Sequence, residues 1–128
     1  MDKAGNWFKQ AEEDLLWAKA SLKERIWRGA CFAAQQSAEK ALKAFLISKE
    51  VRVAKIHDLV TLNQRCFNLE PRFSEIEEAC NILSPYYLSS RYPDVAQFEE
   101  YSENQTKNAA DQAIKIVDFV KSVLIVND

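Results

Sequence analysis

The side chains best suited to chemistry gather in one short stretch, Pro85–Pro93, which holds three tyrosines and one arginine. Arg91 is the single basic residue between Arg72 and Lys107, in an acid-rich half of the chain. A guanidinium can hold a phosphate through two hydrogen bonds while neighbouring aromatic rings stack on bases. Arg91 and Tyr92 are therefore our first candidates for a ligand site. The structural alternative is an arginine tied to a carboxylate and tyrosines that cover one end of a helical bundle.

A second set of polar side chains is spaced for one face of a helix. Gln35, Glu39 and Lys43 are four residues apart, so they share one side of a helix, and Glu39 can pair with Lys43. This spacing indicates either a polar strip in a cleft, where it meets a ligand or partner, or an ordinary solvated face. The single histidine, His57, is either a structural group in a connection or a general base.

Metal and thiol chemistry have little support. One histidine and three scattered cysteines cannot form a transition-metal site by themselves, because such sites need three or four converging nitrogen or sulfur ligands. We therefore expect no metal and no cofactor. Cys31, Cys66 and Cys80 form no C-x-x-C pair, which is typical of free thiols in a reducing cytosol.

The composition fits one ordinary globular domain. The chain has 128 residues, of which 48% are apolar, so one continuous core can form. Its two glycines and three prolines supply too few turns for a β-sandwich and exclude glycine-rich phosphate loops. No apolar stretch approaches the length of a signal core or a membrane span. We expect one cytoplasmic domain over residues 1–128.

The charges are divided between two halves of the chain, although the net charge is only −2. Residues 19–56 hold nine basic and three acidic side chains, whereas residues 70–111 hold three basic and nine acidic ones. These halves attract each other within the fold or across a dimer, or the basic half forms a local anion-binding surface.

The first two helices are predicted from apolar periodicity. One runs from Asn6 to Glu24, and its second apolar edge, Leu16 with Trp17 and Ala20, indicates a dimer contact. A break at Arg28-Gly29 precedes an alanine-rich helix over residues 30–49, which suits the centre of a bundle. The short alternating stretch over residues 51–56 is expected to be a connecting loop.

The later helices are predicted from their capping residues. Asp58 caps a third helix, and Ser74 with Glu77 forms a capping box for a fourth, which Pro85 ends or kinks. Ser102 with Gln105 forms a second capping box, which opens a final long helix. The chain is therefore expected to be all-α, an up-and-down bundle of about five helices.

Four motifs, in this order along the chain, resemble the HEPN domain family, named for higher eukaryotes and prokaryotes nucleotide-binding. Together they cover nearly the whole chain, and their order and spacing make the resemblance specific. The motifs are Trp7 with Asp14-Leu15, the run AAQQSAEKALKA over residues 33–44, Lys55-Ile56-His57-Asp58-Leu59, and Ser90-Arg91-Tyr92-Pro93.

The resemblance implies a helical bundle that dimerises and a link to RNA or nucleotides. Many HEPN proteins are metal-independent ribonucleases or are paired with a small nucleotidyltransferase, often as the toxin of a toxin–antitoxin system. In the ribonucleases an arginine is followed after four to six residues by a histidine. If Arg91 matches that arginine, Ala96, Gln97 and Phe98 stand where the histidine is expected, and none of them is a general base.

These observations predict a nucleotide- or RNA-associated HEPN module, a homodimer that partners a separately encoded minimal nucleotidyltransferase in a toxin–antitoxin-like pair. One alternative is a metal-independent endoribonuclease, in which His57 deprotonates the ribose 2′-hydroxyl and Arg91 neutralises the phosphorane. The other alternative is a purely structural dimerisation module. The ligand-binding candidates are Arg91, Tyr92, Gln35, Glu39 and Lys43.

Overall fold

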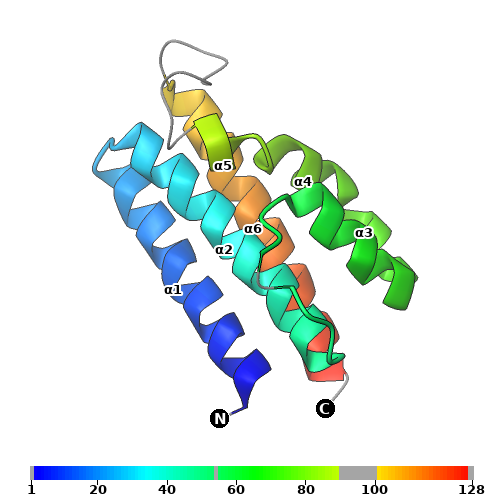
Figure 1. Cartoon of the computed structure of the whole chain (residues 1–128). Coiled ribbons are helices and arrows are strands. Elements are labelled where there is room, and N and C mark those ends of the chain that lie inside the picture. The colour runs from blue at the N-terminus through cyan, green and yellow to red at the C-terminus, as the bar shows by residue number, and fades with distance from the viewer. Residues whose placement is uncertain (1, 54, 90–100, 127–128) are drawn as a thin grey trace.

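Two long helices, joined by a tight turn, are the first elements of the chain. The computed structural model describes residues 2–53, 55–89 and 101–126. α1 (Lys3–Lys23) and α2 (Trp27–Ser48) run antiparallel and pack against each other along their length (Figure 1). The apolar stripe predicted for the first helix is confirmed, because Ala11, Leu15 and Ala18 are buried. The helix begins three residues earlier than predicted, since the Asp2 side chain accepts a hydrogen bond from the Gly5 N–H.

α2 is the central helix of the bundle. It contacts α1 on one side and α3, α4 and α6 on the others, so its apolar surface is covered almost all round. Small side chains allow these close approaches. The buried alanines of α2 are Ala30, Ala33, Ala34, Ala38, Ala41 and Ala44.

Both helices of this hairpin end in the same backbone turn, a Schellman motif. After α1, Arg25 has φ 62°, and the N–H of Ile26 donates to the carbonyl of Ser21. After α2, Glu50 has φ 62°, and the N–H of Val51 donates to the carbonyl of Leu46. Neither residue is the glycine that usually occupies this left-handed position, so the sequence carries no signal for these turns.

The break expected at Arg28-Gly29 is therefore displaced. Gly29 lies within the first turn of α2, and the chain reverses before it, over residues 24–26. A Cβ on Gly29 would lie 3.1 Å from Cγ2 of Ile26. This glycine permits close packing of the turn and does not break the helix.

The third helix is confirmed and the predicted start of the fourth is wrong. α3 (Leu59–Leu69) begins where expected, with the Asp58 side chain accepting from the N–H of Val60. The Ser74 capping box does not form, because Pro71 starts a 3-10 helix, η1 (Pro71–Ile76), whose three-residue period buries Phe73 and Ile76. α4 (Glu77–Leu83) continues directly from it.

The last long helix, α6 (Glu103–Val126), packs against α1, α2 and α4. Its predicted capping box is confirmed: the Gln105 N–H donates to Oγ of Ser102 at 3.0 Å, and the Ser102 N–H donates to Oε1 of Gln105 at 3.3 Å. Among the described residues between α4 and α6, one further helical turn, α5 (Tyr86–Ser89), lies beside α2.

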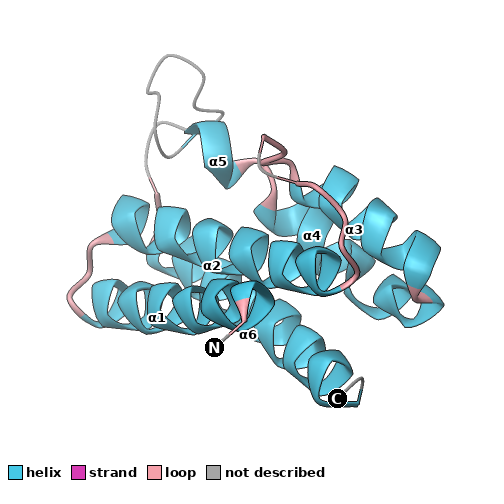
Figure 2. Ribbon diagram, turned by 60° about the horizontal axis from the view of Figure 1, so that its bottom comes forward, coloured by secondary structure: helices cyan, strands magenta, loops and turns pink. Residues whose placement is uncertain are grey.

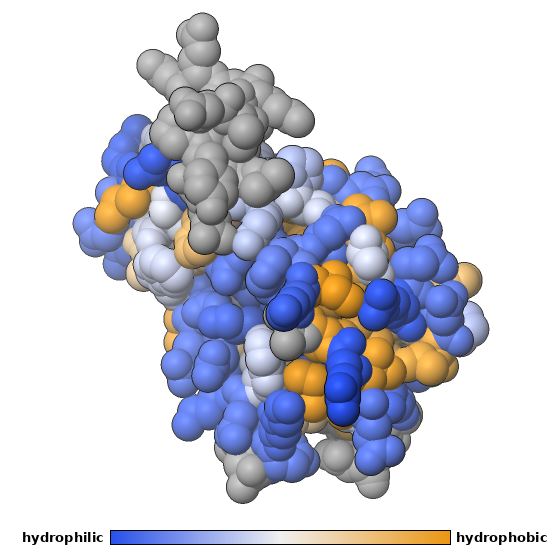
Figure 3. Space-filling model, in the orientation of Figure 1, coloured by the Kyte–Doolittle hydropathy of each residue, from blue (hydrophilic) through white to orange (hydrophobic). Residues whose placement is uncertain are grey.

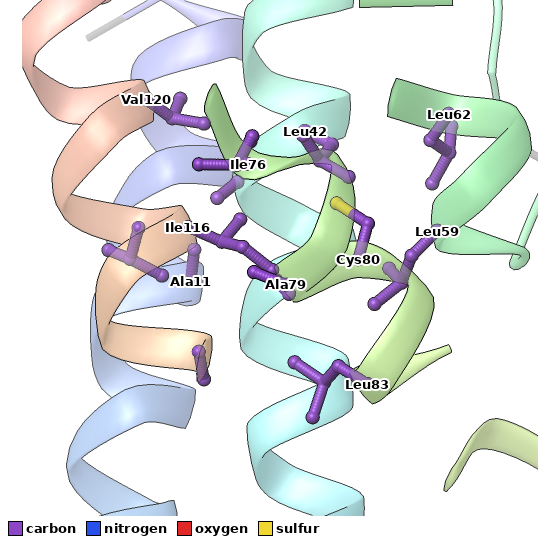
Figure 4. Packing of buried hydrophobic residues seen from close by; sticks show 14 of the residues in the cluster. Ala11, Leu42, Leu59, Leu62, Ile76, Ala79, Cys80, Leu83, Ile116 and Val120 are labelled. Carbon is purple, nitrogen blue, oxygen red and sulfur yellow. The ribbon is translucent and has the colours of Figure 1, made fainter. Parts of the chain in front are cut away.

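One cluster of apolar side chains connects the two sides of the bundle. In the close view, Ile116 and Val120 of α6 lie beside Ile76 and Ala79, while Leu42 of α2 lies on the other side of the short helical segment (Figure 4). Phe45 and Phe73 add a ring contact with centroids 4.6 Å apart. α2, α4, η1 and α6 thus form one packed core.

The predicted all-α class and the up-and-down bundle are confirmed. Five helices of at least seven residues and no strand occur in the described ranges of the chain (Figure 2). Residues 51–53, 55 and 56, the described part of the stretch over residues 51–56, lie in a loop, as expected. No helix among the described residues is both long and apolar enough to span a membrane.

The second apolar edge of α1 is exposed, as its position on the helix predicts. Leu16 is 65% and Trp17 is 48% exposed, and the Trp17 ring meets the edge of Phe32 from α2. One ion pair in the described part of the chain joins the basic and acidic halves, between Arg25 and Glu103 at 3.4 Å. It is exposed and adds little to stability.

Candidate functional site

Four of the predicted site residues come together at one point of the bundle, and two lie outside the described residues. Arg91 and Tyr92, the first candidates, belong to the latter group. Gln35, Glu39 and Lys43 follow one face of α2, and His57 reaches them from the loop before α3. We call these four residues the Glu39 cluster.

Glu39 is the centre of this cluster, because three side chains donate hydrogen bonds to its carboxylate. Lys43 Nζ lies 2.9 Å and His57 Nδ1 3.0 Å from Oε2, while Gln35 Nε2 lies 3.3 Å from Oε1. Gln35 Nε2 also lies 3.3 Å from the His57 carbonyl oxygen, which fixes the loop to α2. One carboxylate therefore holds two segments that are eighteen residues apart in sequence.

The polar strip on α2 is neither the solvated face nor the open cleft surface that its spacing suggests. Gln35 is 0%, Glu39 5% and Lys43 2% exposed. An unpaired charge at this depth would be costly, so the carboxylate and the ammonium must compensate each other. Lys43 Nζ also lies 5.6 Å from the ring centroid of Trp7, which supplies a further favourable contact for the cation.

His57 brings the buried cluster to the surface. Its side chain is 43% exposed, although Nδ1 points inward to Glu39. Because a carboxylate can only accept, Nδ1 is the donor of this bond, which leaves Nε2 as the ring nitrogen that carries the lone pair in the neutral tautomer. A carboxylate that fixes an imidazole in this way is the arrangement that orients a general base.

Tyr87, in α5, completes the site. Its ring lies parallel to the His57 ring, with an interplanar angle of 6° and centroids 4.8 Å apart. The site therefore presents two stacked rings above a buried ion pair. In the sequence Tyr87 was only one of three tyrosines in a candidate stretch, and no periodic signal connected it to His57.

Tyr86, the neighbouring tyrosine, has the structural role given above as the alternative to ligand binding, that of a tyrosine that covers the bundle. It is buried, and its ring lies 6.1 Å from that of Tyr101. Burial raises the pKa of Tyr86 to about 12, with smaller contributions from Cys31 and Tyr101. Two adjacent tyrosines thus face opposite environments, one in the core and one against His57.

The three cysteines are buried and free. Burial raises the pKa of Cys31 to about 11 and that of Cys80 to about 12, so both remain thiols rather than reactive thiolates. Within the described ranges, no group of three or more His, Cys, Asp or Glu side chains is placed to hold a metal ion.

The fold is similar to three solved structures. The protein TT1696 from Thermus thermophilus is 33% identical, has a TM-score of 0.81, and the match covers 95% of this chain and 98% of that one. ST0689, described as an archaeal HEPN homologue, is 32% identical with a TM-score of 0.76 and the same coverage. An HEPN domain protein of Thermotoga maritima, TM0613, is 25% identical with a TM-score of 0.70, over 93% of this chain and 97% of that one.

Sequence comparison gives the same relationship. A protein of Methanocaldococcus jannaschii named "Putative toxin MJ1304" is 29% identical in an alignment of 133 positions, which covers 91% of this chain and 82% of that protein. The HEPN domain model matches residues 4–123. Its span includes the Glu39 cluster and nearly all of the three long helices, α1, α2 and α6. The chain belongs to the HEPN domain family.

Proposed function

We propose that this protein is a nucleotide- or RNA-associated HEPN module of a toxin–antitoxin-like pair, and that the whole chain is one such domain. Membership of the HEPN family supports the association with nucleotides or RNA, and the name of the M. jannaschii relative supports the link to a toxin–antitoxin pair. The partner we propose is a separately encoded minimal nucleotidyltransferase.

The observation that carries the proposal is the Glu39 cluster. A buried carboxylate fixes the exposed imidazole of His57, and the ring of Tyr87 lies against it. Partly exposed aromatic rings offer stacking surfaces for bases. α5 ends at Ser89, two residues before Arg91, so this arginine is close in sequence to the site and is our candidate for the phosphate contact.

Binding of a fluorescent RNA, followed by anisotropy, tests this proposal. His57→Ala and Arg91→Ala should each weaken binding about tenfold, since each removes one direct contact worth about 1.4 kcal/mol. Glu103→Gln, which removes an exposed carboxylate of α6, is the matched control and should leave binding unchanged. Equal affinity of all three variants and the unmodified protein would exclude the Glu39 cluster as the RNA site.

Partner binding is tested separately from ligand binding. The proposal predicts that a gene beside that of this protein encodes a minimal nucleotidyltransferase, and that co-expression of the two proteins gives a complex that survives size-exclusion chromatography. Failure of both experiments would leave the purely structural dimerisation module as the function. Dimerisation itself is proposed to use the exposed edge of α1 at Leu16 and Trp17.

A metal-independent endoribonuclease is the second candidate, and one contact favours it. The hydrogen bond from Nδ1 of His57 to Glu39 leaves Nε2 as an outward base, which can take the proton from a ribose 2′-hydroxyl. In that reaction Arg91 neutralises the charge on the phosphorane. Cleavage of RNA in the presence of EDTA that disappears in both His57→Ala and Arg91→Ala supports this function. The absence of cleavage that depends on these residues excludes it.

A further inference from the structure

A cavity of about 90 Å³ lies between α3 and the segment formed by η1 and α4, and it shares no residue with the Glu39 cluster. Figure 3 shows apolar and polar side chains mixed on the side of the molecule that α3 and α4 form in Figure 1. The cavity is much smaller than a drug-sized ligand site, about 300–1,000 Å³, but larger than the ~10–15 Å³ that one water needs. It therefore suits a single extended side chain or a ligand of similar size.

Two apolar side chains of α3 line the cavity. Val60 and Phe67 are both exposed, and they stand on the same helix face as Gln64, four residues after the first and three before the second. Apolar surface of this kind can cover a short hydrocarbon chain, as it does for the stem of a lysine side chain. A phenyl ring in the wall also favours a cation over an anion.

Asn63 brings a buried hydrogen-bond acceptor without a partner to the cavity. This residue of α3 lines the cavity and is only 5% exposed, and its Nδ2 donates to the Phe73 carbonyl at 3.3 Å. Because a carbonyl can only accept, this bond fixes the orientation of the amide. It leaves Oδ1 with no partner among the described residues. A buried carbonyl oxygen is costly unless a donor reaches it.

Two further acceptors line the same cavity. Glu77 is exposed, has no ion pair in the described part of the chain, and is the one charged residue that the structure places on the cavity wall. Gln64 donates its amide N–H to Asn68 at 3.3 Å, so its carbonyl oxygen remains available. Ser74 and Asn81, which also line the cavity, can donate or accept. This set complements an ammonium, which has three N–H donors and no acceptor.

We propose that this cavity binds a primary alkylammonium group, with the hydrocarbon stem along Val60 and Phe67 and the ammonium donating to Oδ1 of Asn63 and to the Glu77 carboxylate. A lysine side chain of a partner protein and a free aliphatic diamine share this chemistry. The site is independent of the proposed function, since it uses none of the residues assigned there to RNA.

Two-dimensional ¹H–¹⁵N NMR of the labelled full chain follows the site through the side-chain amide signal of Asn63. n-Butylammonium should shift this signal in a saturable manner. 1-Butanol keeps the hydrocarbon stem without the charge, and tetramethylammonium keeps the charge without an N–H donor. Each should bind at least about fivefold more weakly than n-butylammonium.

Three substitutions test the two acceptors. Glu77→Gln should weaken n-butylammonium binding about fivefold, because it removes the negative charge. Glu78→Gln removes the adjacent exposed carboxylate, which does not line the cavity, so this matched control should change the affinity by less than about twofold. Asn63→Leu should weaken binding about tenfold, because it removes the carbonyl acceptor, and the Gln64 amide signal reports on this variant. Circular dichroism of each variant checks that the helices are intact.

Two larger probes separate the sources of the ammonium. If N-acetyl-lysine methylamide binds as tightly as n-butylammonium, the cavity accepts a lysine side chain on a backbone. If putrescine binds at least about fivefold more tightly than the lysine compound, the ligand is a free diamine. Both results support the site. An Asn63 signal that does not saturate, equal affinity for 1-butanol and n-butylammonium, or equal affinity of Glu77→Gln and the unmodified protein would overturn the proposal.

Discussion

Glu39 shows how one buried charge organises a surface site. Its carboxylate is almost inaccessible, yet it fixes an exposed imidazole through one hydrogen bond and a buried ammonium through another. Replacing Glu39 or Lys43 alone leaves the other charge unpaired in a place that water does not reach. The same interaction therefore contributes to stability and sets the orientation of His57.

This coupling predicts a strongly non-additive mutant cycle. Lys43→Met should lower the free energy of unfolding by about 3 kcal/mol, because it leaves Glu39 buried without its ammonium partner. The double variant Glu39→Gln/Lys43→Met should recover at least about 1 kcal/mol of that loss. Urea denaturation of Lys43→Met, Glu39→Gln and the double variant measures the free energies of unfolding. Additive effects of the two substitutions would mean that the pair is not electrostatically coupled.

Asp58, which caps α3, predicts a dependence of stability on pH. Burial alone would raise the pKa of this carboxyl, but hydrogen bonds from Ser84, Thr61 and the Val60 N–H outweigh it and hold the pKa below its ordinary value. A carboxyl with a lower pKa in the folded state stabilises the fold above its unfolded pKa, about 3.9. That contribution is lost as the pH falls through the folded pKa.

The measurement compares Asp58→Asn with the unmodified protein by thermal denaturation from pH 7 down to about pH 3. The difference in melting temperature should be largest at neutral pH and should narrow toward the acid end. Asp111→Asn, an exposed position on α6, is the control and should give a small difference at every pH. A difference for Asp58→Asn that stays constant with pH would contradict the prediction.

At the scale of elements, α1 and α2 each end in the backbone hydrogen bonds of a Schellman motif. Arg25 and Glu50 occupy left-handed positions in the two Schellman motifs, where a side chain costs about 1 kcal/mol and glycine costs little. After α2, Val51 turns back and packs against the core, whereas Ile26, after α1, is 56% exposed. Packing therefore explains the left-handed turn after α2 only.

Glycine substitution tests this account of the turns. Glu50→Gly should raise the free energy of unfolding by about 0.5–1 kcal/mol. Arg25→Gly should gain less, because Arg25 also contacts Glu103 and the Trp27 ring. Lys19→Gly, at an exposed position inside α1, should instead lose about 1 kcal/mol. Destabilisation in all three variants would show that the turns are not strained.

At the scale of the whole molecule, the exposed edge of α1 predicts a homodimer in solution. Leu16 and Trp17 lie beside each other on the outer face, and a large apolar surface of this kind is costly in water unless a partner covers it. Leu16→Glu should shift the molar mass in size-exclusion chromatography with light scattering from dimer to monomer. Lys9→Glu, an exposed charge change elsewhere on α1, should leave the dimer intact. If the unmodified protein is a monomer, the prediction is contradicted.

The sequence by itself determined the helices, their buried stripes and the family. Apolar residues at steps of three and four mark α1, α3 and α6 because a helix buries one face, and the caps at Asp58 and Ser102 act through local bonds. Such signals depend on neighbours in the chain, so they can be read without a structure. The start that the sequence predicts for α4 at Ser74 is wrong, because Ser74 lies within the 3-10 helix that begins at Pro71.

Only the tertiary structure decided what the polar residues do. The spacing of Gln35, Glu39 and Lys43 gave their common face, but not that the face is buried, because burial depends on α1 and the loop that covers α2. The contacts of His57 with Glu39 and Tyr87 join segments 18 and 30 residues away, and no local pattern encodes such distances. Packing of distant segments converts an ordinary helix face into a candidate site.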